Sequence, residues 1–107
     1  ISLIDPTEDI EIGDWNMDTT GNLNVPHGVV FSTIVGVSSV MIIADGSGVV
    51  APLDRLIDST DTTRQGGIRN IDTTNIQLYR LDAGHFDSVS YDDTGFNRGY
   101  IILEYLA

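Results

Sequence analysis

Short apolar runs alternate with polar, glycine-rich connections along the whole chain. The runs contain many β-branched and aromatic residues, and the connections contain mainly Gly, Asp, Asn, Ser and Thr. This composition is typical of strands joined by turns, and no run has convincing helical periodicity. The pattern therefore predicts an all-β fold, either an antiparallel β-sandwich or a small barrel. We expect the sandwich, with about six to eight strands and no substantial helix. Strands are expected at 9–17, 23–25, 31–44, 49–53, 68–71, 76–81 and 100–106.

Two of these runs leave alternatives open. The first, residues 9–17, is expected to be broken or bulged at Gly13. The longest, residues 31–44, competes with an amphipathic helix, but its β-branched residues, Gly36 and the lack of a charged face favour a strand. Asp45-Gly46-Ser47-Gly48 has the composition of a hairpin loop. The polar segment 55–65 could be a loop or one short helical turn.

The final run is apolar on both of its faces. Alternate residues of a strand point to opposite sides, and both sets here are apolar except for Glu104. Such a strand is covered on both faces, by a second sheet or by a neighbouring subunit. The run therefore predicts a central strand. The two sets are Ile101, Leu103 and Tyr105 on one side and Tyr100, Ile102 and Leu106 on the other.

The length of 107 residues fits one domain. Residues 1–8 are expected to be an entry arm or linker, and residues 9–107 the single β-sandwich domain. Crossing a bilayer takes about 20 apolar residues. The longest apolar stretch, Val29–Ala44, is interrupted by Ser, Thr and Gly, so no membrane insertion is expected.

The charge is strongly negative. Five Arg and no Lys face sixteen Asp and Glu, which gives a formal net charge of −11. Such a chain repels phosphate backbones, because nucleic-acid binding needs clustered cations. Nucleic acid is therefore not an expected partner. The acidity favours solubility, and the alternative is that some carboxylates surround Ca²⁺. Cysteine is absent, so disulfides and thiolate metal sites are excluded.

Enzyme motifs are missing, and we predict no catalytic residue, no metal ligand and no cofactor. The two histidines, His27 and His85, lie in glycine-flanked turns without a surrounding ligand set. The spacing of Asp14, Asn16 and Asp18 matches an EF-hand loop, but the sixth and twelfth positions do not. Three acidic pairs could bind Ca²⁺ or form Asx turns, and the turns are favoured. A carboxylate pair for glycoside hydrolysis is a weaker alternative. The pairs are Asp58/Asp61, Asp82/Asp87 and Asp92/Asp93.

Three stretches together resemble the small distal domains of phage tail-fibre and related receptor-binding proteins. They are Gly13–Met17, His27-Gly28, and His85–Ser88 followed by Asn97–Ile101. One departure is Tyr100, where the resemblance leads us to expect Trp. Some of these domains are similar to the H-type lectin sandwich. The resemblance implies a trimeric all-β head of a fibre, on a virion or outside the cell, that binds a host-surface glycan or protein.

The expected function is therefore a non-enzymatic, lectin-like receptor-binding or carbohydrate-binding head for host attachment. The alternative is a structural trimerisation or assembly module without a ligand. Binding residues are expected in loops displayed by the rigid sandwich. Trp15 is expected as a core or interface anchor more than as a sugar-stacking platform. Arg98 is expected to form an intramolecular or intersubunit salt bridge with a carboxylate such as Glu104 or Asp87 more than to contact the ligand. The candidate binding residues are His85, Asp87, Tyr91, Asp92 and Asn97, with Trp15 and Arg98 as support.

Overall fold

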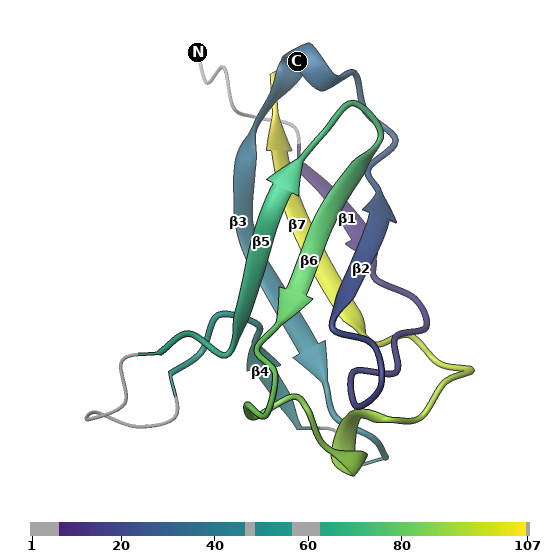
Figure 1. Cartoon of the computed structure of the whole chain (residues 1–107). Coiled ribbons are helices and arrows are strands. Elements are labelled where there is room, and N and C mark those ends of the chain that lie inside the picture. The colour runs from purple at the N-terminus through teal and green to yellow at the C-terminus, as the bar shows by residue number, and fades with distance from the viewer. Residues whose placement is uncertain (1–6, 47–48, 57–62, 107) are drawn as a thin grey trace.

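The computed structural model describes residues 7–46, 49–56 and 63–106, and these form two antiparallel sheets packed face to face (Figure 1). Sheet A has the strand order β1-β7-β3-β4, and sheet B has the order β2-β6-β5. The predicted all-β sandwich is confirmed. The strands are β1 (Thr7–Glu11), β2 (Asn22–Pro26), β3 (Ile34–Ile43), β4 (Val50–Pro52), β5 (Gly66–Ile71), β6 (Asn75–Arg80) and β7 (Gly99–Tyr105).

Helical structure in the described residues is limited to two single 3-10 turns, η1 (Phe31–Thr33) and η2 (Val89–Tyr91). Neither approaches the length needed to span a membrane, and none of the described segments forms a helix that could do so. The turn η1 occupies the start of the segment 31–44 that was expected to be one strand. The long strand is therefore confirmed, but it begins three residues later, at Ile34.

The first strand differs from its expected bounds. β1 already includes Thr7 and Glu8, which pair with β7, and it ends at Glu11. Gly13 follows with a φ of +79°, a conformation that glycine adopts readily. The break near Gly13 is therefore confirmed, but the chain continues as a loop and not as a strand. Most of the segment 55–65 (57–62), with the pair Asp58/Asp61, lies outside the described residues.

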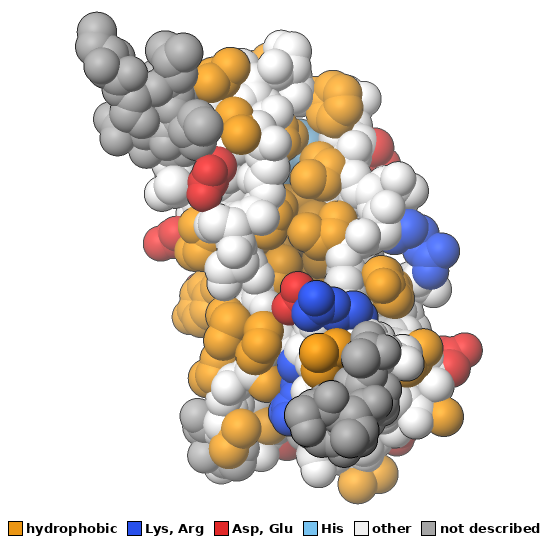
Figure 2. Space-filling view, turned by 90° about the vertical axis from the view of Figure 1, so that its left-hand side faces the viewer, with side chains coloured by type: hydrophobic (Ala, Val, Ile, Leu, Met, Phe, Trp, Pro, Cys, Tyr) orange, Lys and Arg blue, Asp and Glu red, His pale blue; other side chains and the backbone are white. Residues whose placement is uncertain are grey.

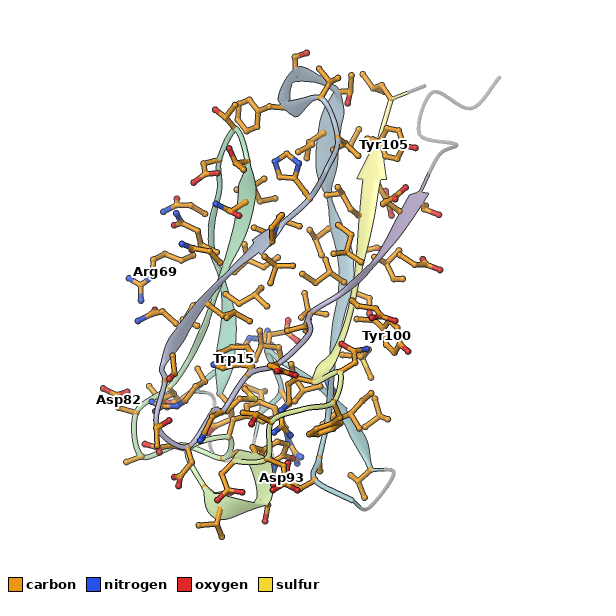
Figure 3. The ribbon with its side chains drawn as sticks, turned by 90° about the vertical axis from the view of Figure 1, so that its right-hand side faces the viewer. Trp15, Arg69, Asp82, Asp93, Tyr100 and Tyr105 are labelled. Atoms are coloured by element: carbon orange, nitrogen blue, oxygen red, sulfur yellow. The ribbon has the colours of Figure 1, made fainter. Side chains whose placement is uncertain are left out.

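The last strand is central, as predicted, because β7 lies between β1 and β3 in sheet A. Ile101 and Leu103 face sheet B and are completely buried. The other face of β7 was also expected to be covered, but the second sheet does not cover it. Tyr100 is 44% exposed on that outer face, and Figure 3 shows it projecting away from the sandwich. Coverage by a neighbouring subunit stays a prediction.

The core lies between the sheets and continues into the loops at one end of the sandwich. Trp15 and Phe86 come from those loops and are almost fully buried. Burial of such large side chains contributes about 1.5–3 kcal/mol each, so the loops are packed parts of the fold. The other buried apolar residues are Ile12, Met17, Val25, Ile42, Ala44, Ala51, Leu53, Ile76, Leu78, Tyr91, Ile101 and Leu103.

One side of the sandwich is open, because β4 pairs only with the last residues of β3, Met41–Ile43. Earlier in β3, two irregularities interrupt its register with β7, between Ile34 and Gly36 and between Val37 and Ser39. A groove of about 240 Å³ runs there between β3, β4 and β5. Figure 2 shows hydrophobic side chains at the bottom of this hollow.

Candidate functional site

Three connections meet at one end of the sandwich, which we call the loop end. They are the β1–β2 connection, the β3–β4 hairpin and the long segment between β6 and β7 (lower part of Figure 1). The backbone joins them directly: the Met17 N–H donates to the Tyr91 carbonyl, and the Asp45 N–H donates to the Ser90 carbonyl. Distant segments therefore meet in one place here.

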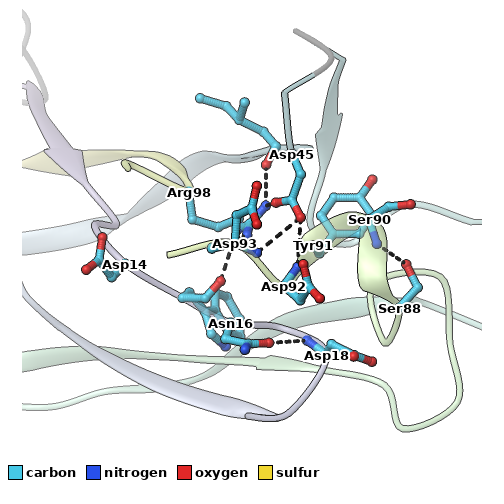
Figure 4. Close-up of polar contacts among 12 residues, drawn as sticks. Asp14, Asn16, Asp18, Asp45, Ser88, Ser90, Tyr91, Asp92, Asp93 and Arg98 are labelled. Atoms are coloured by element: carbon cyan, nitrogen blue, oxygen red, sulfur yellow. Dashed lines mark hydrogen bonds and ion pairs between the residues drawn. The ribbon is translucent and has the colours of Figure 1, made fainter. Parts of the chain in front are cut away.

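Arg98 is the main polar link at the loop end, and it is completely buried. Its guanidinium donates to the carbonyls of Trp15, Ile43 and Asp93 over 2.8–3.0 Å. Its Nη1 also lies 2.8 Å from Oδ1 of Asp45, an ion pair (Figure 4). A buried charge is tolerated only when it is paired and hydrogen-bonded in this way. Arg98 therefore connects all three segments as a structural residue.

Arg80 has the same role nearby. It is 7% exposed, and its guanidinium donates to the carbonyls of Met17 and Asp18 and to the carboxylate of Asp82. Asp87 lies 3.6 Å from its Nη2 and also accepts the Ala83 N–H at 2.8 Å. Asp87 therefore fixes a turn and the Arg80 side chain.

Three carboxylates gather beside Arg98. Oxygens of Asp45, Asp92 and Asp93 lie within 4.8 Å of one another. Asp45 is already engaged, because its Oδ2 accepts the backbone N–H of Asp92 and of Asp93 and its Oδ1 faces Arg98. A Ca²⁺ ion takes six to eight oxygen ligands, and the adjacent guanidinium opposes a second cation. The donor set therefore fits a turn held by Asp45 better than a calcium site.

The pKa values follow from these contacts. Burial by itself would raise the pKa of Asp45, but the Asp93 amide, Arg98 and the Asp92 amide outweigh it, and the pKa is lowered. Asp92 behaves oppositely, because its own burial and the neighbouring Asp45 carboxylate raise its pKa. Asp45 is therefore the carboxylate that the loop end is built to keep charged.

An aromatic cluster lies on the other side of Asp45. The rings of His85, Phe86 and Tyr91 contact each other edge to face, with centroids 5.0–5.6 Å apart. Nε2 of His85 lies 3.3 Å from Nη1 of Arg55 and 3.1 Å from the Tyr91 hydroxyl. Since arginine can only donate, Nε2 accepts and the neutral ring carries its proton on Nδ1. Burial, and then the charge of Arg55, lower the pKa of His85 accordingly.

An open cleft of about 390 Å³ lies against this cluster. Its lining combines uncharged hydrogen-bonding groups with apolar surface, and its only carboxylate is the ion-paired Asp45. Burial raises the pKa of Tyr91, so its hydroxyl stays neutral as well. Such a lining can bind hydroxyl groups, and it presents little charge to a ligand. The lining residues are Ala44, Asp45, Val49, His85, Ser88, Ser90 and Tyr91.

No family model, curated protein or solved structure matches this chain. The resemblance to tail-fibre domains therefore stays a prediction, as do the absence of catalysis, the trimer and the extracellular location.

The predicted binding residues do gather at the loop end, but in different roles. His85 and Tyr91 line the cleft, although only the edge of Tyr91 is accessible, because it is 4% exposed. Asp92 does not line the cleft, but its backbone N–H donates to Asp45, which does. Asp87, Asn97, Trp15 and Arg98 hold the loops: the Asn97 Oδ1 accepts the N–H of Gly13 at 2.9 Å, and the indole of Trp15 donates to the Thr20 carbonyl at 2.8 Å.

The predicted salt bridge of Arg98 is present, but the two carboxylates suggested as its partner are wrong. Neither Glu104 nor Asp87 pairs with Arg98; the partner is Asp45, because β7 begins beside the end of β3 and so brings Arg98 against the β3–β4 hairpin. The sequence predicts Asp92/Asp93 and Asp82/Asp87 as turn formers, but it does not identify the residues that contact them. Asp45 accepts hydrogen bonds from the backbone of Asp92 and Asp93, and Arg80 pairs with Asp82 and Asp87. Arg80 could have been found, because it continues the inward series of Ile76 and Leu78.

Proposed function

We propose that this chain is a non-enzymatic carbohydrate-binding domain, the head of a viral or phage-like fibre that attaches to a host-surface glycan. The observation that carries the proposal is the character of the cleft. In a chain with a net charge of −11, the cleft presents the neutral imidazole of His85 and the hydroxyls of Ser88 and Ser90, with the mostly buried Tyr91 behind them. Val49 and Ala44 supply apolar surface beside them.

This combination suits an uncharged ligand with several hydroxyl groups. Sugar hydroxyls both donate and accept, as do Ser hydroxyls, and the neutral His85 ring can donate through Nδ1. The apolar face of a sugar ring would pack on Val49, which is 56% exposed. An anionic ligand would instead meet Asp45, Asp92 and Asp93. A trimer of such heads would multiply a weak single-site affinity by avidity.

The test is a glycan-array and host-cell binding screen with the whole chain and two variants. In the first variant, His85→Ala and Ser90→Ala remove two hydrogen-bonding groups without touching Arg98 or Arg80. The second, Ser32→Ala, removes an exposed hydroxyl from η1, which is not part of the cleft. We expect saturable binding to neutral glycans that the first variant weakens at least about tenfold, or about 1.4 kcal/mol. Equal binding by both variants, or no binding to any glycan, would refute the cleft as the site.

A second candidate function is assembly, and the outer face of sheet A favours it. The register aligns Tyr100, Met41 and Pro52 across β7, β3 and β4, and it pairs Ile43 with Val50 beside them. These residues are uncharged, although the next strand of the sheet, β1, places Glu11 beside Tyr100. Since copies with a net charge of −11 repel each other, they would meet on exposed apolar side chains such as Tyr100 and Val50, away from the carboxylates of β1. The proposed occupant of this face is therefore a second copy of the chain.

A further inference from the structure

The outer face of sheet B differs from the rest of this acidic molecule. Its three strands, β2, β5 and β6, contain no Asp or Glu, although the chain has sixteen. Amide side chains take their place. They are Asn22, Asn24, Asn70, Asn75 and Gln77.

The strand register arranges these side chains in two parallel rows. In the first row Asn24, Gln77 and Asn70 are direct neighbours across the three strands. In the second row, two residues further along, Asn22 is followed by Tyr79 and then Gly67. The rows lie about 7 Å apart, twice the rise of a strand residue, and each is about 10 Å wide. Together they form a flat polar surface, which we call the amide face.

The second row is held in place by Arg69. Its guanidinium lies 5.5 Å from the centre of the Tyr79 ring and donates to Oδ1 of Asn22 at 3.1 Å, across the width of the sheet. Gly67 lets the Tyr79 ring lie against β5, because a Cβ there would stand 3.3 Å from two atoms of the ring. Figure 3 shows Arg69 on the side of the sandwich opposite Tyr100. Asn22 is thereby oriented, with its amide N–H groups left to donate.

The first row is similarly pre-positioned. Gln77 donates to Oδ2 of Asp72 at 3.2 Å, and its Oε1 lies 3.5 Å from Nδ2 of Asn70. Asn24 is exposed, and its amide makes no hydrogen bond to any described residue. A groove of about 280 Å³ lies over this part of the sheet, lined by Asn22, Asn24, Arg69, Gln77 and Leu78.

We propose that the amide face is a second ligand site, which binds an extended neutral polysaccharide. A primary amide donates and accepts at once, which matches pairs of sugar hydroxyls. Two amides whose orientation is already fixed lose little entropy on binding. The single cation, Arg69, is occupied by Tyr79 and Asn22, so the face offers no cluster of positive charge to an anionic polymer. The site is separate from the cleft at the loop end and does not depend on it.

The experiment is an NMR titration of the isotopically labelled whole chain with maltohexaose, cellohexaose and mannohexaose at millimolar concentrations. We expect at least one of them to shift the side-chain amide resonances of Asn24, Asn22 and Gln77 in a saturable way. The double variant Asn24→Ala/Gln77→Ala should weaken that binding at least about tenfold. Asn24→Asp, which keeps the shape of the side chain and adds a negative charge, should weaken it as well.

Two comparisons make the result decisive. The cleft variant His85→Ala/Ser90→Ala should change the affinity of the amide face less than twofold, so the two sites can fail independently. Ser38→Ala, on the other sheet, is the control for an exposed polar group. The proposal is overturned if none of the three hexasaccharides shifts these resonances. It is also overturned if a sulfated hexasaccharide binds more tightly than all three, because Arg69 would then act as an anion site.

Discussion

Arg98 and Asp45 form an ion pair of 2.8 Å at the loop end, and the Arg98 side chain is completely buried. The pair joins the residue directly before β7 to the β3–β4 hairpin. Three backbone carbonyls accept further hydrogen bonds from the guanidinium. The geometry of the candidate cleft therefore depends on a residue that does not line the cleft.

Removing the guanidinium should be strongly destabilising. In Arg98→Met the carboxylate of Asp45 and the three carbonyls lose their partner, and we expect the free energy of unfolding to fall by about 3–5 kcal/mol. Urea denaturation measures the loss. Arg69→Met, at an exposed arginine, is the control and should cost less than about 1 kcal/mol. Equal stability of Arg98→Met and the native chain would contradict the structural role of Arg98.

Two glycines make a second matched test. A methyl group on Gly99 would overlap the Met41 carbonyl oxygen in the neighbouring strand, whereas a methyl group on Gly36 meets no atom within 4 Å. Gly99→Ala must therefore push β7 and β3 apart, and it should cost about 1–3 kcal/mol or more. Gly36→Ala should be neutral or slightly stabilising. Thermal unfolding of the two variants gives the comparison, and a similar loss for both would argue against this strand register.

The stability of the fold should depend on His85 in mildly acidic solution. Burial, and then Arg55, lower its pKa in the folded state below the ordinary value of 6.5. Between the folded-state pKa and 6.5 the unfolded chain binds more protons, so stability decreases as the pH falls through this range. His85→Gln should remove that part of the pH dependence. The measurement is the urea midpoint from pH 7.5 downwards, and an unchanged slope in His85→Gln would contradict this assignment.

A separate effect is expected at lower pH from Asp72. Its Oδ1 accepts the N–H of Asn75 at 2.7 Å and of Thr74 at 2.9 Å, and these bonds lower its pKa below 3.8. Its stabilisation is complete above 3.8 and is lost as the pH falls through the folded-state pKa. At pH 7, Asp72→Ala should have a lower melting temperature than the native chain. This difference in melting temperature between the two proteins should become smaller at acidic pH. Asp72→Asn keeps an acceptor and should lose less.

Self-association gives the test of the assembly function. Ile102 lies on the outer face of sheet A, opposite Asp9 of β1. Ile102→Asp would place two carboxylates side by side on a face that two copies would share, so an oligomer should dissociate. Asn24→Asp adds the same charge to sheet B and should leave the oligomer intact. Sedimentation velocity distinguishes the outcomes. A native chain that is monomeric at every concentration would rule out this interface.

Much of the fold was predictable because local pattern determines strands and turns. The apolar run of β7 and the β-branched residues of β3 predicted these strands, and the Asp72 turn followed from its composition. The pairing of Arg98 with Asp45 was not predictable, because the sequence does not say which loops meet at one end of a sandwich. The same limit applies to Tyr91, which was expected in an exposed loop and is held in the core by Phe86 and His85. The amide face needed the register as well, since Asn24 and Asn70 become neighbours of Gln77 only through strand pairing.

The irregular half of β3 has a consequence for how copies of this chain can associate. The segment Ile34–Ser39 has no strand partner on the side away from β7 in the described structure, and such an edge can recruit a strand from another molecule. Both register shifts of β3 lie in this half. A regular ladder cannot continue along a strand interrupted twice within a few residues. Growth of a continuous intermolecular sheet is therefore blocked along this edge of sheet A, and copies that associate on this side must use the faces of the sheets, which can form closed complexes.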